Sequence, residues 1–323
     1  MAALTRRALT GGLAGLALTT RAGAAEWPAR AITIVHGFPP GGPSDVVARL
    51  IADGLSRALG QSVIVEIRTG ASGTTAAALV ARAAPDGYTL MVIPSGHPAA
   101  AATFARLPFR AVDDFTMITL ASTYPYVMSV PSAAGIASVA ELVERGRTRA
   151  TPLTYGTPGA GTGPHLAIEL LALQTKMKVQ HVPFRGSAPA VTELIAGRLD
   201  FMMDPPASMM QFIRDGRLRA LAVSSGERYS GLPDTPTLTQ AGIAGFDVSG
   251  WQGLVAPAGV PEPIVSRLNR EVRRILLEPA TIERLHAFSN DAKPSTPEEF
   301  KARIESDIAK WSAVVEQIHF EKI

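Results

Sequence analysis

The sequence contains no cysteine, and this absence excludes disulfide bonds, thiolate catalysis and metal sites with cysteine ligands. Charged residues are few, at 18% of the 323 residues, and aromatic residues make up 6%. Beyond residue 25 no stretch reaches about 18 uninterrupted apolar residues, so no membrane-embedded helix is expected in the mature chain. The remaining composition, 46% hydrophobic, is that of a globular protein of roughly two domains.

An excess of one charge sign is also absent from most of the chain. Lysine and arginine outnumber aspartate and glutamate by 31 to 28, but Arg6, Arg7 and Arg21 account for the difference. The chain beyond residue 25 is therefore neutral, and it lacks the basic surface that nucleic acids or anionic lipids require. No nucleic-acid partner is expected.

The first 25 residues have the layout of a secretory signal peptide. Arg6 and Arg7 form a positive segment, residues 8–20 are apolar, and residues 22–25 are small. The arginine pair partly matches a twin-arginine signal, so the sequence leaves export by the general secretory route or by the twin-arginine route open. We predict that residues 1–25 are a signal peptide and that the mature chain is exported.

Short apolar runs rich in β-branched residues alternate with segments of helical periodicity. Strands at 31–36, 62–67 and 88–93, with helices after the first two, indicate βαβ units and a parallel sheet. A second set of such units begins near residue 123, and a return strand begins near 248. The further expected strands are 115–120, 126–130, 153–155, 179–182, 199–203, 218–223 and 248–255.

This pattern predicts an α/β fold of two lobes joined by crossing segments. Residues 26–122 and 248–323 would form lobe 1, and residues 123–247 would form lobe 2. A capping box at Thr296–Glu299 predicts the start of a last helix, whose apolar face would lie in the core.

Loops rich in glycine, proline and serine follow six of the expected strands. The carboxyl ends of strands in open α/β sheets are where ligands bind, and glycine lets the backbone approach a ligand closely. Five of the six loops contain no lysine or arginine, and only Arg185 breaks the pattern. The inferred site therefore suits a carboxylate held by backbone amides and hydroxyls, although ordinary βα turns have a similar composition. The loops are 37–45, 70–75, 94–98, 156–164, 183–187 and 204–206.

Motifs for catalysis or cofactors are scarce. The glycine-rich segment 156–163 has neither P-loop nor dinucleotide-binding spacing, and the histidines lack metal-ligand spacing. No cofactor or metal is expected. Ser95 and His97 leave a serine hydrolase open as an alternative. Asp45 either caps or orients the first loop. Asp204 lies at a strand end, where it would accept a ligand amine or hydroxyl, hold a water molecule or cap a turn.

The loops, taken in order, resemble those of the Bug (Bordetella uptake gene) family. These proteins are extracytoplasmic receptors of the tripartite tricarboxylate transporter type. The segments that carry the resemblance cover nearly the whole mature chain. They are 32–49 (ITIVHGFPPGGPSDVVAR), 82–90 (RAAPDGYTL), 155–166 (YGTPGAGTGPHL), 181–190 (HVPFRGSAPA), 197–204 (GRLDFMMD), 218–223 (LRALAV), 232–237 (LPDTPT) and 251–261 (WQGLVAPAGVP).

The resemblance implies a two-lobed periplasmic binding protein fold of the type II-like class. Each lobe would be a parallel or mixed sheet flanked by helices, with a cleft between the lobes for a small carboxylate. The chain departs from the family pattern at Ile67 and Thr69, and it has Phe184-Arg185 where Tyr-Lys is common. The implied ligand-binding residues are Phe38, Gly42, Ser44, Asp45, Ala71, Gly73, Ser95, His97, Gly159, Gly161, Thr162, Phe184, Gly186, Ser187 and Asp204.

The expected function is that of a periplasmic receptor. It would capture a small organic carboxylate by domain closure and deliver it, as a monomer, to transporter subunits in a transient complex. Two alternatives stay open: a sensor that presents the solute to a sensor kinase, and a periplasmic serine hydrolase that uses Ser95 and His97.

Overall fold

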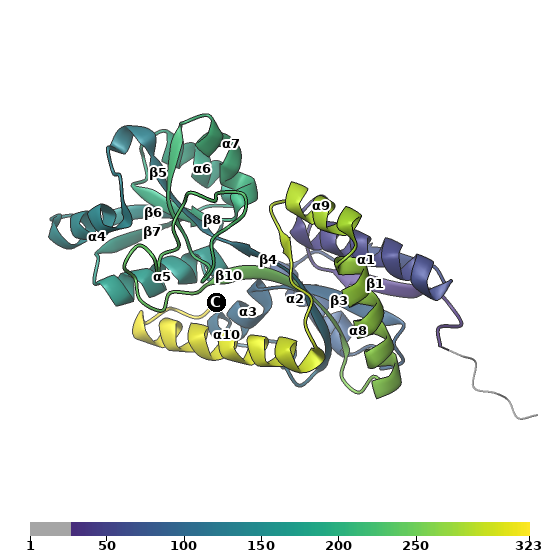
Figure 1. Cartoon of the computed structure of the whole chain (residues 1–323). Coiled ribbons are helices and arrows are strands. Elements are labelled where there is room, and N and C mark those ends of the chain that lie inside the picture. The colour runs from purple at the N-terminus through teal and green to yellow at the C-terminus, as the bar shows by residue number, and fades with distance from the viewer. Residues whose placement is uncertain (1–26) are drawn as a thin grey trace, which may run out of the picture.

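The computed structural model describes residues 27–323, which form two mixed β-sheets flanked by helices (Figure 1). The expected signal peptide, residues 1–25, lies outside the described residues. We call the six-stranded sheet and its helices lobe 1, and the five-stranded sheet and its helices lobe 2.

Lobe 1 has the strand order β11-β4-β10-β3-β1-β2, in which β1 pairs in parallel with both β2 and β3. Successive residues of β1 point to opposite faces, so Ile34 joins a core under α1 and α8, and Val35 joins a core under α2 and α10. The strands are β1 Ile32–His36, β2 Val63–Ile67, β3 Thr89–Pro94, β4 Phe115–Pro125, β10 Ser249–Pro257 and β11 Asp291–Ala292. The helices are α1 Pro43–Leu59, α2 Thr74–Ala81, α3 Gly96–Thr103, α8 Glu262–Leu276, α9 Pro279–Ala287 and α10 Pro297–Gln317, with a 3₁₀ turn η1 at Ala71–Gly73.

Lobe 2 has the strand order β7-β6-β8-β5-β9. β6 is parallel to β7 and β8, whereas β5 is antiparallel to β8 and β9. The strands are β5 Val127–Pro131, β6 Leu153–Thr157, β7 Val179–Pro183, β8 Phe201–Asp204 and β9 Leu218–Val223. The helices are α4 Val139–Thr148, α5 Gly163–Thr175, α6 Ser187–Ile195 and α7 Pro206–Arg214, with a 3₁₀ turn η2 at Ser132–Ala134.

The expected alternation of strands and helices is confirmed, and both sheets are mixed, which is one of the two forms expected for each lobe. The strand that leaves lobe 1 was expected to end at residue 120, and β4 continues to Pro125 because β10 pairs with it along its whole length. The expected loops 94–98 and 204–206 overlap regular elements: α3 begins at Gly96, and the loop 204–206 is limited by the end of β8 at Asp204 and the start of α7 at Pro206.

The chain passes between the lobes through β4 and β10, which run antiparallel through the middle of the molecule (Figure 1). Their pairing extends from Phe115 opposite Pro257 to Pro125 opposite Ser249. The lobe boundary expected at 122/123 lies inside β4, and the one expected at 247/248 lies just before β10.

The last helix, α10, packs against both lobes. Its first half contributes Phe300 and Ile304 to the core of lobe 1, and its second half contributes Trp311, Val314 and Val315 to the core of lobe 2. The expected capping box is present, since the Thr296 hydroxyl accepts the Glu299 amide and the Glu299 carboxylate accepts the Thr296 amide. In Figure 1 this helix lies along the base of the molecule beneath the crossing strands.

No helix of residues 27–323 is both long enough and apolar enough to cross a lipid bilayer.

Because α10 packs closely on the crossing strands, we expect a side chain added at their contact to destabilise the protein. A Cβ at Gly253 of β10 would lie 2.1 Å from the Phe300 ring. We expect Gly253→Ala to lower the free energy of unfolding by about 1–3 kcal/mol, because the buried ring has to move. Urea denaturation would measure the change. Gly96→Ala is the matched control, since a Cβ there meets no atom closer than 3.9 Å. Equal loss in both variants would contradict the packing argument.

Candidate functional site

The first expected loop leads into α1, whose N-cap Gly42 has no side chain to satisfy the first amides of the helix. Ser44 is buried, and its hydroxyl donates to Gln252 Oε1 of β10 at 2.8 Å. Phe38 is half-buried, and its ring lies 3.0 Å from the Cβ position of Gly73. The loop is thus tied to the crossing strand and to the second loop.

Asp45 organises the first loop through several hydrogen bonds. Its carboxylate accepts the Gly41 amide at 2.9 Å and the Arg49 guanidinium at 3.0 Å, and it lies 3.2 Å from His36 Nε2. Burial opposes ionisation, but the bonds from Arg49, Gly41 and His36 outweigh it and hold the pKa of Asp45 below its ordinary value. These contacts support the expectation that Asp45 orients the loop.

The second and third loops of lobe 1 come together with the first. Ala71 is exposed, while Gly73 is buried at the N-cap of α2 with φ +89°. A Cβ at Gly37 would lie only 2.5 Å from the Gly73 Cα, so the first two loops are in backbone contact. A small cavity connects the three loops, and its lining includes Phe38, Gly73, Gly96 and His97.

His97 points into the core of lobe 1. Its Nε2 lies 2.9 Å from the Ala111 carbonyl oxygen, and its ring stacks on Phe109 at 5.3 Å. Burial lowers the pKa of His97 to about 4, so the ring is neutral at physiological pH. Ser95 is buried, and no hydrogen bond joins it to His97 within residues 27–323. The geometry therefore does not assemble the nucleophile and base that the hydrolase alternative needs.

Two tyrosines that were not expected at the site, Tyr124 near the end of β4 and Tyr126 directly after it, link the loops of both lobes. Burial raises the pKa of Tyr124 to about 12 and that of Tyr126 well above its ordinary value, and both hydroxyls contact Ser95. The Tyr126 hydroxyl also lies 2.1 Å from the Cβ position of Gly163, at the start of α5. The sequence did contain a signal for this position, because two of the chain's five tyrosines are separated by a single residue there.

The expected loops of lobe 2 lie at the starts of α5 and α6. Thr162 is the N-cap of α5, but its hydroxyl donates to the Gly159 carbonyl at 2.7 Å rather than capping the helix. Gly186 is the N-cap of α6, which begins at Ser187, and the half-buried Phe184 lies beside this turn. Gly161, with φ +72°, approaches lobe 1, since a Cβ there would lie 3.2 Å from Thr103 Oγ1.

Several of the expected amide donors already have partners. The partners are His36 Nδ1 for Phe38, the Gly70 carbonyl for Gly73, the Trp251 carbonyl for Ser95, Thr157 Oγ1 for Gly159, His165 Nδ1 for Gly161 and the Pro158 carbonyl for Gly186. The donors left for a ligand are therefore the amides in the first turns of the helices that follow these loops. Helices α1, α2, α3, α5 and α6 all begin without a side-chain cap from the described residues.

Asp204, at the end of β8, is fully buried. Its Oδ2 accepts the Ser208 hydroxyl at 2.5 Å, whereas its Oδ1 has no hydrogen-bond partner among residues 27–323. Burial raises the pKa of Asp204 to about 6, and contacts with Ser187 and Ser208 only partly offset this effect. The negative charge of Asp204 also contributes to the raised pKa of Tyr124 and Tyr126.

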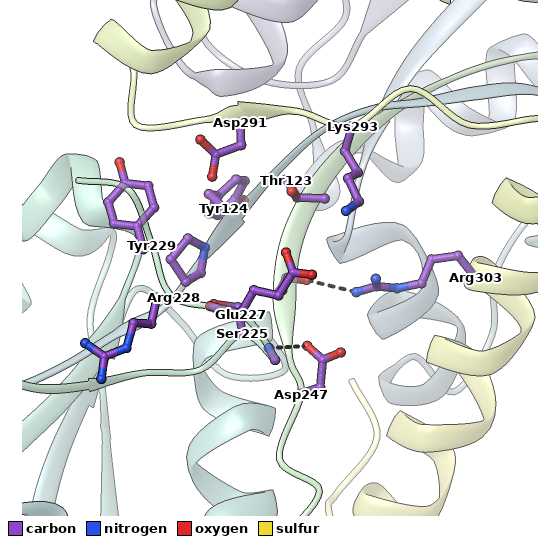
Figure 2. A pocket seen from close by; sticks show the side chains of 13 residues that line it. Thr123, Tyr124, Ser225, Glu227, Arg228, Tyr229, Asp247, Asp291, Lys293 and Arg303 are labelled. Carbon is purple, nitrogen blue, oxygen red and sulfur yellow. Dashed lines mark hydrogen bonds between the residues drawn. The ribbon is translucent and has the colours of Figure 1, made fainter. Parts of the chain in front are cut away.

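A second cavity, of about 220 Å3, lies on the other side of the crossing strands. Lys293 and Arg303 of lobe 1 point toward it from one side and Glu227 of lobe 2 from the other (Figure 2). In lobe 1 the crossing strands β4 and β10 separate this region, which lies beside β11, from the loop-bearing strands β3, β1 and β2. In lobe 2, β5 separates the same region, which lies beside β9, from the loop-bearing strands β8, β6 and β7. The lobes also touch here, since the Ser230 hydroxyl lies 3.5 Å from Asp291 Oδ1.

The raised pKa of Asp204 predicts a pH-dependent effect of Asp204→Asn. The carboxyl binds its proton more tightly in the folded state than in the unfolded chain. Its ionisation therefore lowers the free energy of unfolding as pH rises from about 4 to 6, and this lowering is complete above pH 6. We expect the asparagine substitution to raise the free energy of unfolding by about 2–3 kcal/mol at pH 7.5 and to change it little at pH 4. Urea denaturation at the two pH values tests this, and an equal change at both would contradict it.

Comparison with known proteins agrees with this architecture. The family model described as tripartite tricarboxylate transporter family receptor matches residues 47–320. The UPF0065 protein in the tcbD-tcbE intergenic region of Pseudomonas sp. (strain P51) is 36% identical over 98% of this chain and 95% of that protein. Protein BugT of Bordetella pertussis is 31% identical over 90% of each chain.

Solved structures show the same fold. R. palustris Rpa4515 with adipate superposes with a TM-score of 0.79 and 32% identity, covering 92% of this chain and 100% of that one. MatC from Rhodopseudomonas palustris with bound malate superposes with a TM-score of 0.74 and 35% identity, covering 89% of this chain and 99% of that one. The periplasmic binding protein BugD superposes with a TM-score of 0.75 and 30% identity, covering 92% of this chain and 100% of that one. This chain therefore has the two-lobed periplasmic binding protein fold, and it belongs to the Bug family of tripartite tricarboxylate transporter receptors.

Proposed function

We propose that this protein captures a small organic carboxylate between its two lobes, closes over it and delivers it to a tripartite tricarboxylate-type transporter. The proposed site comprises the fifteen residues expected from the sequence, with Tyr124, Tyr126 and Gln252 added at its floor. The protein would act in the periplasm as a monomer, with residues 1–25 serving as its signal peptide.

The observation that carries the proposal is the set of uncapped helix starts that follow the loops of both lobes. Each helix N-terminus carries roughly half a positive charge and free amides, which favour an anion. α1, α2 and α3 come from lobe 1, and α5 and α6 from lobe 2. Missing caps alone are not specific, because α8 and α9 also lack them away from these loops. The position at the carboxyl ends of the strands is what supports a shared site.

The chemistry of the loops favours a carboxylate over a phosphate ester. Arg185 is exposed and is the one cationic side chain in the six loops. Each carboxylate group carries a single charge and needs few charge-assisted hydrogen bonds, each contributing about 1.5–3 kcal/mol. Two relatives support this class, since their structures contain adipate and malate. The unpartnered Oδ1 of Asp204 would accept a hydroxyl, an amine or a water molecule that accompanies the acid.

Thermal denaturation with candidate acids tests the receptor function directly. We expect malate or adipate to raise the melting temperature of the protein without being consumed, because a ligand at 100 times its Kd stabilises the folded state by about 2.7 kcal/mol. Mass spectrometry of small molecules released from the purified protein identifies the natural ligand. Consumption of the acid, lost in Ser95→Ala, would instead indicate an enzyme.

Substitutions in the loops distinguish amide binding from binding by a side-chain cation. We expect Gly42→Val to weaken carboxylate binding more than Arg185→Ala, because the valine would block backbone approach, whereas the Arg185 side chain is exposed to solvent. Gly42 is the cleanest position, since its φ is −81° and a Cβ there meets no protein atom closer than 3.6 Å. Gly161→Val should act in the same direction. Calorimetry with malate and adipate measures both effects.

The opposite ranking would refute the amide model. If Arg185→Ala abolished binding while both glycine variants bound normally, the cation would be the main anchor. Melting temperatures of the variants control for misfolding, which matters most at Gly161 because of its positive φ.

Domain closure predicts a change in the distance between α1 and α7. The chain has no cysteine, so Asp53→Cys and Ala207→Cys introduce two unique labelling sites on exposed positions of the two lobes. We expect the distance between spin labels at these sites, measured by double electron–electron resonance, to shorten when an acid that the protein binds is added. An unchanged distance under saturating ligand would contradict closure.

A further inference from the structure

Two histidines, His165 and His181, lie directly beneath the loop that precedes α5. His165 is 4% exposed in the first turn of α5, and His181 is half-buried on β7. Their rings stack with centroids 3.9 Å apart and an angle of 17° between the ring planes. The Tyr155 ring stacks on His181 at 5.0 Å. Neither histidine was expected to contribute to the site.

Each ring makes a hydrogen bond to the loop. The Gly161 amide donates to His165 Nδ1 at 3.0 Å, and His181 Nε2 lies 2.6 Å from Thr157 Oγ1. The Thr157 hydroxyl also lies 3.0 Å from the Gly159 carbonyl oxygen and accepts the Gly159 amide at 3.3 Å. Since that hydroxyl has one proton, donating it to Gly159 leaves His181 as the donor to Thr157. The two rings thus fix both ends of the loop.

The loop needs such support because its own sequence provides little. Gly159, Ala160 and Gly161 have no large side chain to pack, and glycine loses the most conformational freedom on folding. Gly159 and Gly161 both have positive φ, at +156° and +72°. Without external hydrogen bonds, the loop would sample many conformations in which the first amides of α5 no longer point toward a ligand.

The His165 ring has to be neutral for this arrangement. A ring nitrogen that accepts an amide proton carries none of its own, so the other nitrogen of His165, Nε2, bears the proton and lies 3.8 Å from Glu169 Oε1. Burial, together with the charge of His181, lowers the pKa of His165 to about 3, and burial lowers that of His181 to about 4. The titratable groups that face the pair are Glu169, whose own pKa burial raises, and Tyr155, which donates to Glu169.

We propose that His165 and His181 are positioning residues, which hold the loop Thr157–Thr162 so that the first amides of α5 face the ligand. This inference rests on the proposed function for its connection to a ligand. The holding of the loop, in contrast, does not depend on which ligand binds.

Variants of His165 separate the hydrogen bond from the stacking. His165→Phe keeps an aromatic ring but removes the acceptor, whereas His165→Asn places an acceptor near the Nδ1 position and removes the stack. We expect the Gly161 amide to exchange with solvent at least about tenfold faster in His165→Phe than in the wild type, and nearly at the wild-type rate in His165→Asn. Nuclear magnetic resonance of the labelled protein measures this exchange without any ligand.

Calorimetry with malate and adipate provides the second measurement. Affinity should fall at least about tenfold in His165→Phe and recover to within about threefold in His165→Asn. His181→Phe and His181→Gln form the equivalent pair for Thr157, because glutamine places a polar atom near the Nε2 position. His286→Asn is the control, since His286 is exposed on α9 and should change neither quantity.

The outcomes distinguish this inference from the proposed function. Unchanged Gly161 exchange in His165→Phe would overturn the positioning role, whether or not any acid binds. Faster exchange with unchanged affinity would also overturn it, because the loop would then not matter for binding. If the wild type binds neither acid, the proposed carboxylate class fails, and the exchange measurement alone decides whether the histidines hold the loop.

Discussion

The antiparallel pairing of β4 with β10 is the contact on which both lobes depend. It extends from Phe115–Pro257 to Pro125–Ser249, so a single ladder forms the centre of one sheet and leads into the other. This ladder carries Tyr124 and Gln252 to the floor of the proposed site. It also separates the glycine-rich loops on one side from the charged cavity on the other. Any rotation that brings the loops together therefore has to be absorbed by the ends of these two strands.

Both lobes use the same physical solution to the problem of an ordered glycine loop. In lobe 1 a buried histidine, His36, contacts Asp45 and accepts the Phe38 amide at 3.4 Å. In lobe 2 another buried histidine, His165, accepts the Gly161 amide. In each lobe a histidine ring beneath the loop therefore accepts a backbone amide of that loop. Rigidity thus comes from the buried side of the loop, which leaves the outer side to a ligand.

Much of the fold followed from local patterns, whereas the details of the site did not. Apolar runs such as 31–36 identified β1 because its side chains are buried on both faces of a sheet. The extension of β4 to Pro125 was not predictable, because its partner β10 is more than a hundred residues away. For the same reason Tyr124 and Tyr126, at and just beyond its end, were not expected at the site. The occupied amides of Gly161 and Gly186 also escaped prediction, since glycine spacing shows where a backbone is accessible but not which donors are already bonded.

The last helix has a consequence for how such a protein changes over time. Because α10 contributes Phe300 to one core and Trp311 to the other, a substitution along it alters how tightly the two halves are joined. The affinity for a solute includes the free energy of bringing those halves together. Replacements on a helix that contacts no solute can therefore strengthen or weaken retention of the same molecule, and natural selection can adjust the working concentration range without altering the recognition surface.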